Sequence, residues 1–203
     1  MIAIIDYKMG NLQSVKNAFN LYTKDVEVVN DPERLKYFDK VLLPGVGAYK
    51  DAMTHLKENS MDEAIIEFAK SGKPLLGICL GMQLLLESST EFGYTKGLGL
   101  IPGSVELFDK QKFKTPHKIP HMGWNKVFKK QNHKIIDGLS EDFYLYFVHS
   151  YHAKTSNEYI LTTSTYGYEF TSAVCKDNIV GFQPHPEKSH QNGLKIIKNF
   201  VQM

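Results

Sequence analysis

Cys79 lies between two glycines at the point where an apolar strand pattern meets a helical one. The segment Gly77-Ile78-Cys79-Leu80-Gly81 follows the apolar run Pro74–Ile78 and precedes a helical pattern at Met82–Glu87. A nucleophile between small residues at a strand-to-helix turn is the arrangement of a nucleophile elbow. The helix beginning there would direct its positive end at the sulfur and favour the thiolate. A buried structural cysteine is the alternative, because free cysteine packs as a small hydrophobic residue.

A base for this nucleophile is offered by His185 in the segment Gln183-Pro184-His185-Pro186-Glu187, which follows another apolar strand pattern. The two prolines fix the backbone around the histidine. Glu187 can accept a hydrogen bond from one ring nitrogen and leave the other for the thiol. The sequence therefore predicts Cys79 as nucleophile, His185 as acid and base, and Glu187 as its orienting group. A rigid surface turn is the alternative for the histidine segment.

Attack of a thiol on a carbonyl also requires N–H donors for the developing oxyanion, each worth roughly 3 kcal/mol. The backbone N–H of Leu80 is one candidate. The second could come from Pro44-Gly45-Val46-Gly47 at another strand end, where glycines allow close backbone approach or a peptide flip. The same glycines alone would be only a weak phosphate-loop pattern, because the complete nucleotide-binding motifs are absent.

The elements that must hold these residues alternate in the first half of the chain. Strand patterns at Ile2–Asp6, Val26–Val29, Lys40–Leu43 and Pro74–Ile78 alternate with helical patterns at Leu12–Leu21, Tyr49–Glu58 and Met61–Lys70. Strands that are apolar on both faces indicate a parallel sheet covered by helices on both sides.

The second half contains short extended runs at residues 104–108, 125–128, 143–150, 159–165, 171–176 and 179–183, then a helical pattern at 193–201. Asp177-Asn178 is a plausible hairpin turn between the last two runs. We therefore expect one α/β domain spanning residues 1–203, with a largely parallel central sheet, helices on both faces and added antiparallel strands.

Composition narrows the class of protein. The 203 residues are 42% hydrophobic and 23% charged, as in ordinary globular proteins. Lys and Arg number 24 against 22 Asp and Glu, which gives no charge excess for binding nucleic acid. Two cysteines are too few for a disulfide-stapled secreted domain, and no apolar stretch has transmembrane length. No metal-ligand spacing accompanies Cys79 or His185. We expect a cytoplasmic enzyme without metal, cofactor or membrane association.

The motifs at residues 44–47, 77–83 and 185–189 resemble, in order and spacing, those of the class I, triad-type glutamine amidotransferases, whose fold is flavodoxin-like. The resemblance covers essentially the whole chain. It implies that Cys79 attacks the amide of L-glutamine, that ammonia departs and that water hydrolyses the glutamyl thioester. It also implies oxyanion N–H groups from Val46 and Leu80, with the Gly45–Val46 peptide as the moving part.

The resemblance further implies the residues that hold the substrate. Gln83 and Glu91 would bind the α-amino acid group of glutamine, and His149, Ser150 and Tyr151 would offer backbone groups to its carboxylate. A strand-end histidine satisfied by local hydrogen bonds is the alternative for His149.

Four other segments, at residues 6–15, 97–103, 119–125 and 146–151, are similar to glutaminase subunits of imidazole glycerol phosphate synthases. This similarity implies a role in histidine biosynthesis, as a heterodimer with a (β/α)8 cyclase subunit. Ammonia would pass to the cyclase, which forms imidazole glycerol phosphate and aminoimidazole carboxamide ribotide. The implied partner-facing residues are Asn11, Met122, Trp124, Tyr146 and Lys188. Isolated protein would then be nearly inactive.

Several alternatives stay open at this point. Lys8, Gln13 and Pro184 depart from the commonest family pattern without touching the triad. A paralogous glutaminase for sugar amidation in surface-polysaccharide synthesis, another class I amidotransferase and a non-catalytic module are the alternative functions. Trp124 is the only tryptophan and lies in a segment with neither helical nor strand alternation. It suits an interface anchor, with a place in the core as the alternative.

Overall fold

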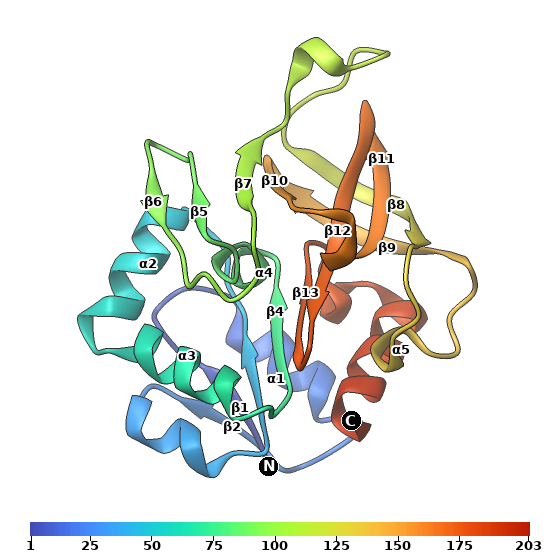
Figure 1. Cartoon of the computed structure of the whole chain (residues 1–203). Helices are drawn as coiled ribbons and strands as arrows, with labels where there is room; N and C mark the ends of the chain where they lie inside the picture. Colours follow the sequence, from blue (N-terminus) through green and yellow to red (C-terminus); the bar gives the residue numbers. More distant parts are fainter.

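Five parallel strands form the centre of the molecule in this computed structural model, which describes all 203 residues. They are β1 (Ile2–Ile5), β2 (Val26–Val29), β3 (Lys40–Leu43), β4 (Leu75–Ile78) and β13 (Ile179–Phe182), in the order β2-β1-β3-β4-β13 (Figure 1). This is the strand order of flavodoxin-like sheets. The expected parallel core is therefore confirmed.

Helices cover both faces of this sheet, as expected. On one face lie α2 (Tyr49–Glu58) and α3 (Met61–Lys70), and on the other α1 (Leu12–Phe19) and α5 (His190–Gln202) (Figure 1). Side chains alternate along β1, so that Ile2 and Ile4 belong to one buried cluster and Ala3 and Ile5 to the other.

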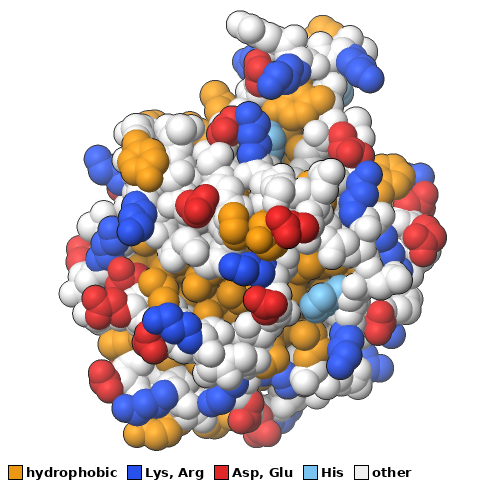
Figure 2. Space-filling view, viewed as in Figure 1, with side chains coloured by type: hydrophobic (Ala, Val, Ile, Leu, Met, Phe, Trp, Pro, Cys, Tyr) orange, Lys and Arg blue, Asp and Glu red, His pale blue; other side chains and the backbone are white.

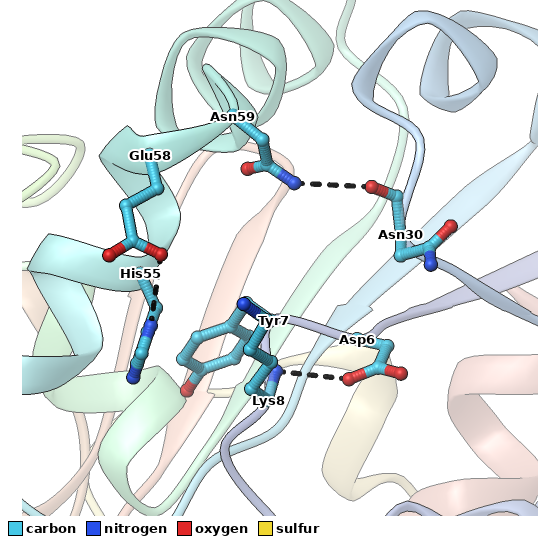
Figure 3. A pocket seen from close by; sticks show the side chains of 7 residues that line it. All are labelled: Asp6, Tyr7, Lys8, Asn30, His55, Glu58 and Asn59. Atoms are coloured by element: carbon cyan, nitrogen blue, oxygen red, sulfur yellow. Dashed lines mark hydrogen bonds and ion pairs between the residues drawn. The ribbon is translucent and has the colours of Figure 1, made fainter.

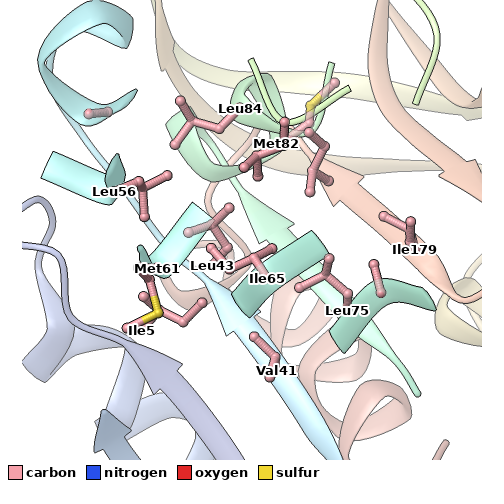
Figure 4. Packing of buried hydrophobic residues seen from close by; sticks show 14 of the residues in the cluster. Ile5, Val41, Leu43, Leu56, Met61, Ile65, Leu75, Met82, Leu84 and Ile179 are labelled. Carbon is pink, nitrogen blue, oxygen red and sulfur yellow. The ribbon is translucent and has the colours of Figure 1, made fainter. Parts of the chain in front are cut away.

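Figure 4 shows the packing on the α2 and α3 side of the sheet, where Leu56, Met61 and Ile65 of the helices lie over Val41, Leu43 and Leu75 of the strands. Each fully buried side chain of this size contributes roughly 1.5–3 kcal/mol through removal from water. Packing on both faces of the sheet thus fixes the positions of the carboxyl ends of the central strands.

Antiparallel strands extend the sheet beyond β13, again as expected. The turn at Asp177-Asn178 joins β12 (Tyr168–Lys176) to β13, and the sheet continues through β10 (Tyr151–Lys154), β7 (Ser104–Leu107), β5 (Ser88–Ser89) and β6 (Thr95–Lys96). β12 also pairs with β11 (Ile160–Tyr166), which leads to β8 (His121–Lys129) and β9 (Asp142–His149). The 3-10 turns are η1 (Pro32–Tyr37), η2 (Lys110–Lys112), η3 (Lys134–Ile136), η4 (Asn157–Tyr159) and η5 (Pro186–Lys188).

Two expectations about local structure are wrong. The segment around Trp124, which has no strand alternation, is the start of β8. Backbone pairing with β9, including Trp124 opposite Tyr146, forms that strand whatever its side-chain pattern. The helical pattern at 82–87 gives only the five-residue α4 (Leu80–Leu84). The carbonyls of Leu84, Leu85 and Leu86 accept N–H groups from residues 98–101 instead of continuing the helix. The dipole of so short a helix is correspondingly small.

Charges of both signs are interspersed over the face of the molecule seen in Figure 2, without a large basic area. This agrees with the near balance of charges in the sequence. None of the helices is long and apolar enough to cross a membrane.

Candidate functional site

The predicted catalytic residues come together at the carboxyl ends of three neighbouring parallel strands. β3 runs into Pro44–Gly47, β4 into Cys79 and β13 into Gln183–Glu187. Ligands of open α/β sheets bind at this edge. Pairing of Phe182 with Ile78 brings the nucleophile and histidine segments side by side, although about a hundred residues separate them in the chain.

The backbone at Cys79 has the sharp turn of a nucleophile elbow. Its φ and ψ are 54° and −110°, a conformation that costs of order 1–3 kcal/mol for a residue with a side chain. The Cys79 N–H donates to the carbonyl of Phe182 at 2.7 Å, which holds the turn. The flanking glycines are needed for close approach, because a Cβ at Gly77 would lie 2.8 Å from the backbone of Gly81.

Substitution of Gly81 by alanine should be severely destabilising. The added Cβ would lie 1.8 Å from the carbonyl oxygen of Leu43, so β3 and the elbow would have to separate. We expect a loss of about 3 kcal/mol or more in the free energy of unfolding, measured by urea denaturation. Gly99→Ala is the control. Its Cβ would meet nothing within 4 Å, so only the strain of a φ of 65° remains, about 1 kcal/mol. Equal losses in the two variants would contradict this account.

His185 and Glu187 form the expected pair beside Cys79. The Nδ1 of His185 lies 2.8 Å from Oε1 of Glu187, and both side chains are 3% exposed. The other ring nitrogen, Nε2, is buried and has no hydrogen-bond partner. It is therefore the nitrogen left to exchange a proton with the thiol, in a contact looser than a hydrogen bond, as is common in sites without ligand.

The protonation of His185 is set by three opposing influences. Burial alone favours the neutral ring, but contacts with the Cys79 thiol and then with the Glu187 carboxylate outweigh it and raise the pKa of His185 to about 10. An imidazolium beside the sulfur favours the thiolate, the reactive form of cysteine. The arrangement can thus supply a proton donor, the His185 imidazolium, at neutral pH.

A cavity of about 270 Å³ opens at Cys79 and is lined by all five predicted substrate residues. It is lined by Val46, Gly47, Cys79, Leu80, Gln83, Glu91, Val148, His149, Ser150 and Tyr151. The amide Nε2 of Gln83 donates to the carbonyl of Tyr151 at 3.1 Å, which leaves its Oε1 without a partner in the protein. A carboxylate oxygen of Glu91 accepts the N–H of Tyr49 at 2.7 Å. The cavity therefore combines a nucleophile with an acidic and an amide group.

The two predicted oxyanion donors, the N–H groups of Leu80 and Val46, are not both available in this conformation. The N–H of Leu80 donates to the carbonyl of Gly45 at 3.3 Å. Rotation of the Gly45–Val46 peptide would remove that carbonyl and turn the N–H of Val46 toward the same place, because both atoms belong to one planar unit. The hydroxyl of Tyr7 donates to the carbonyl of Pro44 at 2.8 Å and fixes the preceding peptide. The site is thus assembled except for its oxyanion hole.

The predicted partner-facing residues lie on the surface beside the triad. Trp124 is 46% exposed and Met122 62%, so neither belongs to the core. The Trp124 ring stacks on His190 at 5.0 Å and meets the Tyr146 ring edge-on at 6.1 Å. The carbonyl of Tyr146 accepts the N–H of His185, which connects this surface to the predicted catalytic base.

Asn11 and Lys188 of the same predicted set line a second, very small cavity of about 20 Å³. It also contains Gly45, Val46, His185 and Glu187. A space of this size holds about one small molecule such as water. It lies on the side of the triad where Asn11 and Lys188 reach the surface.

Two histidines form a buried pair behind the substrate cavity. The Nδ1 of His149 lies 2.8 Å from the carbonyl of Tyr151, and its Nε2 lies 3.0 Å from Nδ1 of His121. His149 is thus satisfied locally, so its side chain is not free for substrate. Burial lowers the pKa of His121 to about 4, with a smaller contribution from His117, and lowers that of His149 well below its usual value.

This pair should make the protein less stable in mild acid. A histidine whose folded pKa lies below its unfolded pKa of 6.5 binds its proton in the unfolded chain first. Stability is therefore greatest above pH 6.5 and falls as the pH is lowered towards 4, by about 3 kcal/mol for His121. Urea denaturation across this range should show a shallower decline for His121→Gln than for wild type. An unchanged slope would contradict the burial of a neutral ring.

Two residues that touch the site carried no functional pattern in the sequence. The side-chain amide of Gln183 contacts the Cys79 sulfur, with Nε2 3.8 Å from Sγ. Tyr7 contacts the oxyanion segment and also lines a separate polar cavity of about 310 Å³ with Asp6, Lys8, Asn30, His55, Glu58 and Asn59 (Figure 3). Neither contact could be predicted from a sequence motif, because each joins the ends of two neighbouring strands that are far apart in the chain.

Comparisons with known proteins agree with this geometry. The profile of the family Glutamine amidotransferase class-I matches residues 3–203. The imidazole glycerol phosphate synthase subunit HisH of Sulfurimonas denitrificans is 60% identical over 202 residues, which cover 99% of this chain and 97% of that relative. The subunit of the same name from Wolinella succinogenes is 52% identical, with full coverage of both chains.

Solved structures show the same fold at low identity. PurLQS from Thermotoga maritima superposes with a TM-score of 0.76 at 18% identity, covering 99% of this chain and 97% of that one. A glutamine amidotransferase superposes with a TM-score of 0.75 at 15% identity, covering 100% and 98%. With the family profile and the full-length relatives, the resemblance found in the sequence is confirmed: the chain belongs to the class-I glutamine amidotransferases and, among them, to the family of HisH subunits of imidazole glycerol phosphate synthases.

Proposed function

We propose that this chain is the glutaminase subunit of an imidazole glycerol phosphate synthase and supplies ammonia for histidine biosynthesis. The observation that carries the chemistry is the placement of Cys79, His185 and Glu187 at one sheet edge, beside a cavity with Gln83 and Glu91. The full-length HisH relatives support the pathway. Glutamine is the substrate, and a cyclase subunit is the partner.

The first chemical step is acyl transfer to sulfur. The Cys79 thiolate attacks the side-chain carbonyl carbon of glutamine, and the oxyanion is held by the N–H groups of Leu80 and Val46. His185 then donates its proton to the leaving nitrogen as the C–N bond breaks, which gives ammonia and a glutamyl thioester. Glu187, 2.8 Å from Nδ1, keeps the ring oriented throughout.

Hydrolysis of the thioester completes the cycle. His185, now neutral, takes a proton from water as the water oxygen attacks the thioester carbonyl. Collapse of this second tetrahedral intermediate breaks the C–S bond, and the sulfur departs as thiolate, so the resting pair is restored. Glutamate leaves with one oxygen from water. The same two N–H groups are needed twice, so the conformation of the Gly45–Val46 peptide controls both steps.

Substrate orientation follows from the groups that line the cavity. The Glu91 carboxylate can bind the α-ammonium of glutamine, and the free Oε1 of Gln83 can accept one of its hydrogens. Backbone groups of residues 149–151 lie on the same wall and would face the α-carboxylate. The side-chain amide then extends toward Cys79.

Ammonia would leave through the small cavity between the triad and the surface at Asn11 and Lys188. That cavity touches both His185 and Glu187 and has room for about one such molecule. The adjoining exposed surface contains Met122, Trp124 and Tyr146, and we propose that the cyclase docks here. A (β/α)8 barrel with its entrance over this exit would receive ammonia without release to solvent.

Trp124 should contribute strongly to that docking. Its ring is half exposed yet held by His190 and Tyr146, so it is a rigid apolar surface at low entropic cost. We expect Trp124→Ala to weaken cyclase binding by about 30-fold or more, which corresponds to about 2 kcal/mol. Calorimetric titration with the purified cyclase would measure this. Tyr94→Ala removes a more exposed aromatic ring from the distant β6 loop and should bind as wild type.

The ammonia acceptor is tested by reconstitution with the cyclase encoded by the same organism. With glutamine and the nucleotide substrate of the histidine pathway, the pair should form imidazole glycerol phosphate. No product with the nucleotide, but amidation of a sugar substrate, would overturn the assignment to histidine biosynthesis while leaving the glutaminase intact.

A further inference from the structure

Gln183 is the residue next to the triad for which the mechanism above gives no role. Its side chain is fully buried directly after β13, and its backbone N–H donates to the carbonyl of Ser172 at 2.9 Å. A buried primary amide carries two N–H donors and one acceptor, all of which need partners. The identity of those partners shows which way the amide points.

The backbone carbonyl of Tyr151 fixes the direction of the Gln183 amide through the side chain of Gln83, which contacts both. The oxygen of Tyr151 can only accept, so the group of Gln83 that meets it at 3.1 Å is the NH2. The same Nε2 of Gln83 lies 2.9 Å from Oε1 of Gln183, which must therefore accept. The NH2 of Gln183 is thereby turned toward Cys79, with Nε2 3.8 Å from Sγ.

The Tyr151 carbonyl, at which this series of hydrogen bonds begins, is itself held in place. His149 meets the Tyr151 oxygen through Nδ1, and His121 meets the far nitrogen of His149. Asn125 contacts the remaining nitrogen of His121 at 3.2 Å and also donates to the carbonyl of Thr165. Each acceptor in this network faces a donor, and the Tyr151 carbonyl faces two, so reversal of a single amide would leave buried groups unpaired.

We propose that Gln183 is a positioning residue that donates a hydrogen bond from its side-chain amide to the sulfur of Cys79. Hydrogen bonds to an ionised acceptor are roughly twice as strong as those to a neutral one, so this donor favours the thiolate over the thiol. It also fixes the direction of the Cβ–Sγ bond relative to the cavity. This role is distinct from that of Leu80 and Val46, whose N–H groups serve the substrate oxygen.

The proposal rests on the proposed function for its consequence in turnover, but its direct test does not need glutamine. The test is the rate of alkylation of Cys79 by iodoacetamide as a function of pH, followed by peptide-resolved mass spectrometry. Gln183→Met keeps the length of the side chain and removes its donors. Its alkylation midpoint should rise by about one pH unit relative to wild type, so that the rate at neutral pH falls about tenfold.

Ser172→Ala is the matched control. It also removes one buried hydrogen bond, between Ser172 Oγ and Thr162 Oγ1, in the neighbouring strands and without contact to the sulfur. Its alkylation midpoint should equal that of wild type. The same midpoint in Gln183→Met and wild type would overturn the proposal, as would an equal shift in Ser172→Ala. Glutaminase activity retained by Cys79→Ser would instead overturn the proposed function and leave the alkylation result standing.

A measurement on the unaltered chain covers the case in which Gln183→Met does not fold. In ¹⁵N-labelled protein, the side-chain amide resonance of Gln183 should shift when Cys79 is alkylated, because its acceptor is then no longer a thiolate. A resonance that stays in place on alkylation would overturn the proposal. With the cyclase present, Gln183→Met should also lower kcat about tenfold and change KM for glutamine much less.

Discussion

Cys79→Ser should abolish glutamine hydrolysis, with a loss on the order of 10⁴–10⁶-fold in kcat. A serine hydroxyl in the same elbow is not ionised near neutral pH, so it would have to lose its proton to His185 during the attack. The thiolate needs no such transfer. The assay is glutamate release in the presence of the cyclase and its ligand, so that the oxyanion hole is complete.

Two controls separate loss of chemistry from loss of structure. The same Cys79→Ser complex supplied with ammonium instead of glutamine should still form imidazole glycerol phosphate, because the fold and the docking surface are untouched. Cys175→Ser replaces the other cysteine, which is buried in β12 away from the cavity, and should keep wild-type glutaminase activity. Full glutaminase activity in Cys79→Ser would eliminate this residue as the nucleophile.

The isolated chain should hydrolyse glutamine slowly, and the cyclase should accelerate it by about 10²–10³-fold. The physical reason is that one oxyanion donor is worth about this factor, and the N–H of Leu80 is occupied by the Gly45 carbonyl. The proposed docking near Asn11 and Lys188 would place the partner against the cavity that Gly45 and Val46 also line. Partner binding can therefore favour the rotated Gly45–Val46 peptide.

The measurement is kcat for the chain alone, for the complex and for the complex with the ligand of the cyclase. The increase should appear mainly in kcat, since the substrate cavity is already formed and only the oxyanion hole is incomplete. Rapid hydrolysis by the chain alone would show that the Leu80 N–H is free in solution. An increase confined to KM would show that the partner shapes the substrate cavity instead.

Much of the fold could be predicted, because most of its strands and helices are specified by residues close together in the chain. The apolar strands at residues 26–29 and 40–43 and the helices at 49–58 and 61–70 have the predicted bounds. Each combines a clear period with nearby turn residues. The start of β8 could not be predicted, because its pairing with β9 is made by backbone groups. The alternation of side chains does not report such pairing. The early end of α4 is likewise caused by a distant segment, residues 98–101.

In the candidate site, too, some features could be predicted from short motifs, whereas others depend on contacts between distant segments. The placement of Cys79, His185 and Glu187 at one sheet edge could be predicted, because each of the three residues lies in a short motif next to an apolar strand pattern. The substrate and partner residues came from family resemblance, and the structure gathers them around one cavity and one neighbouring surface. The contact of Gln183 with sulfur and the closed oxyanion hole depend on angles and amide directions, which no residue pattern encodes.

The proposed mechanism requires that glutamine passes through a thioester on Cys79. The most direct measurement is acid quenching of the working complex during turnover, followed by mass spectrometry of its peptides. We expect a glutamyl adduct on the peptide that contains Cys79, absent from Cys79→Ser and increased when water attack is slowed by His185→Asn. Steady turnover with no adduct on this peptide, or with the adduct on Cys175, would contradict it.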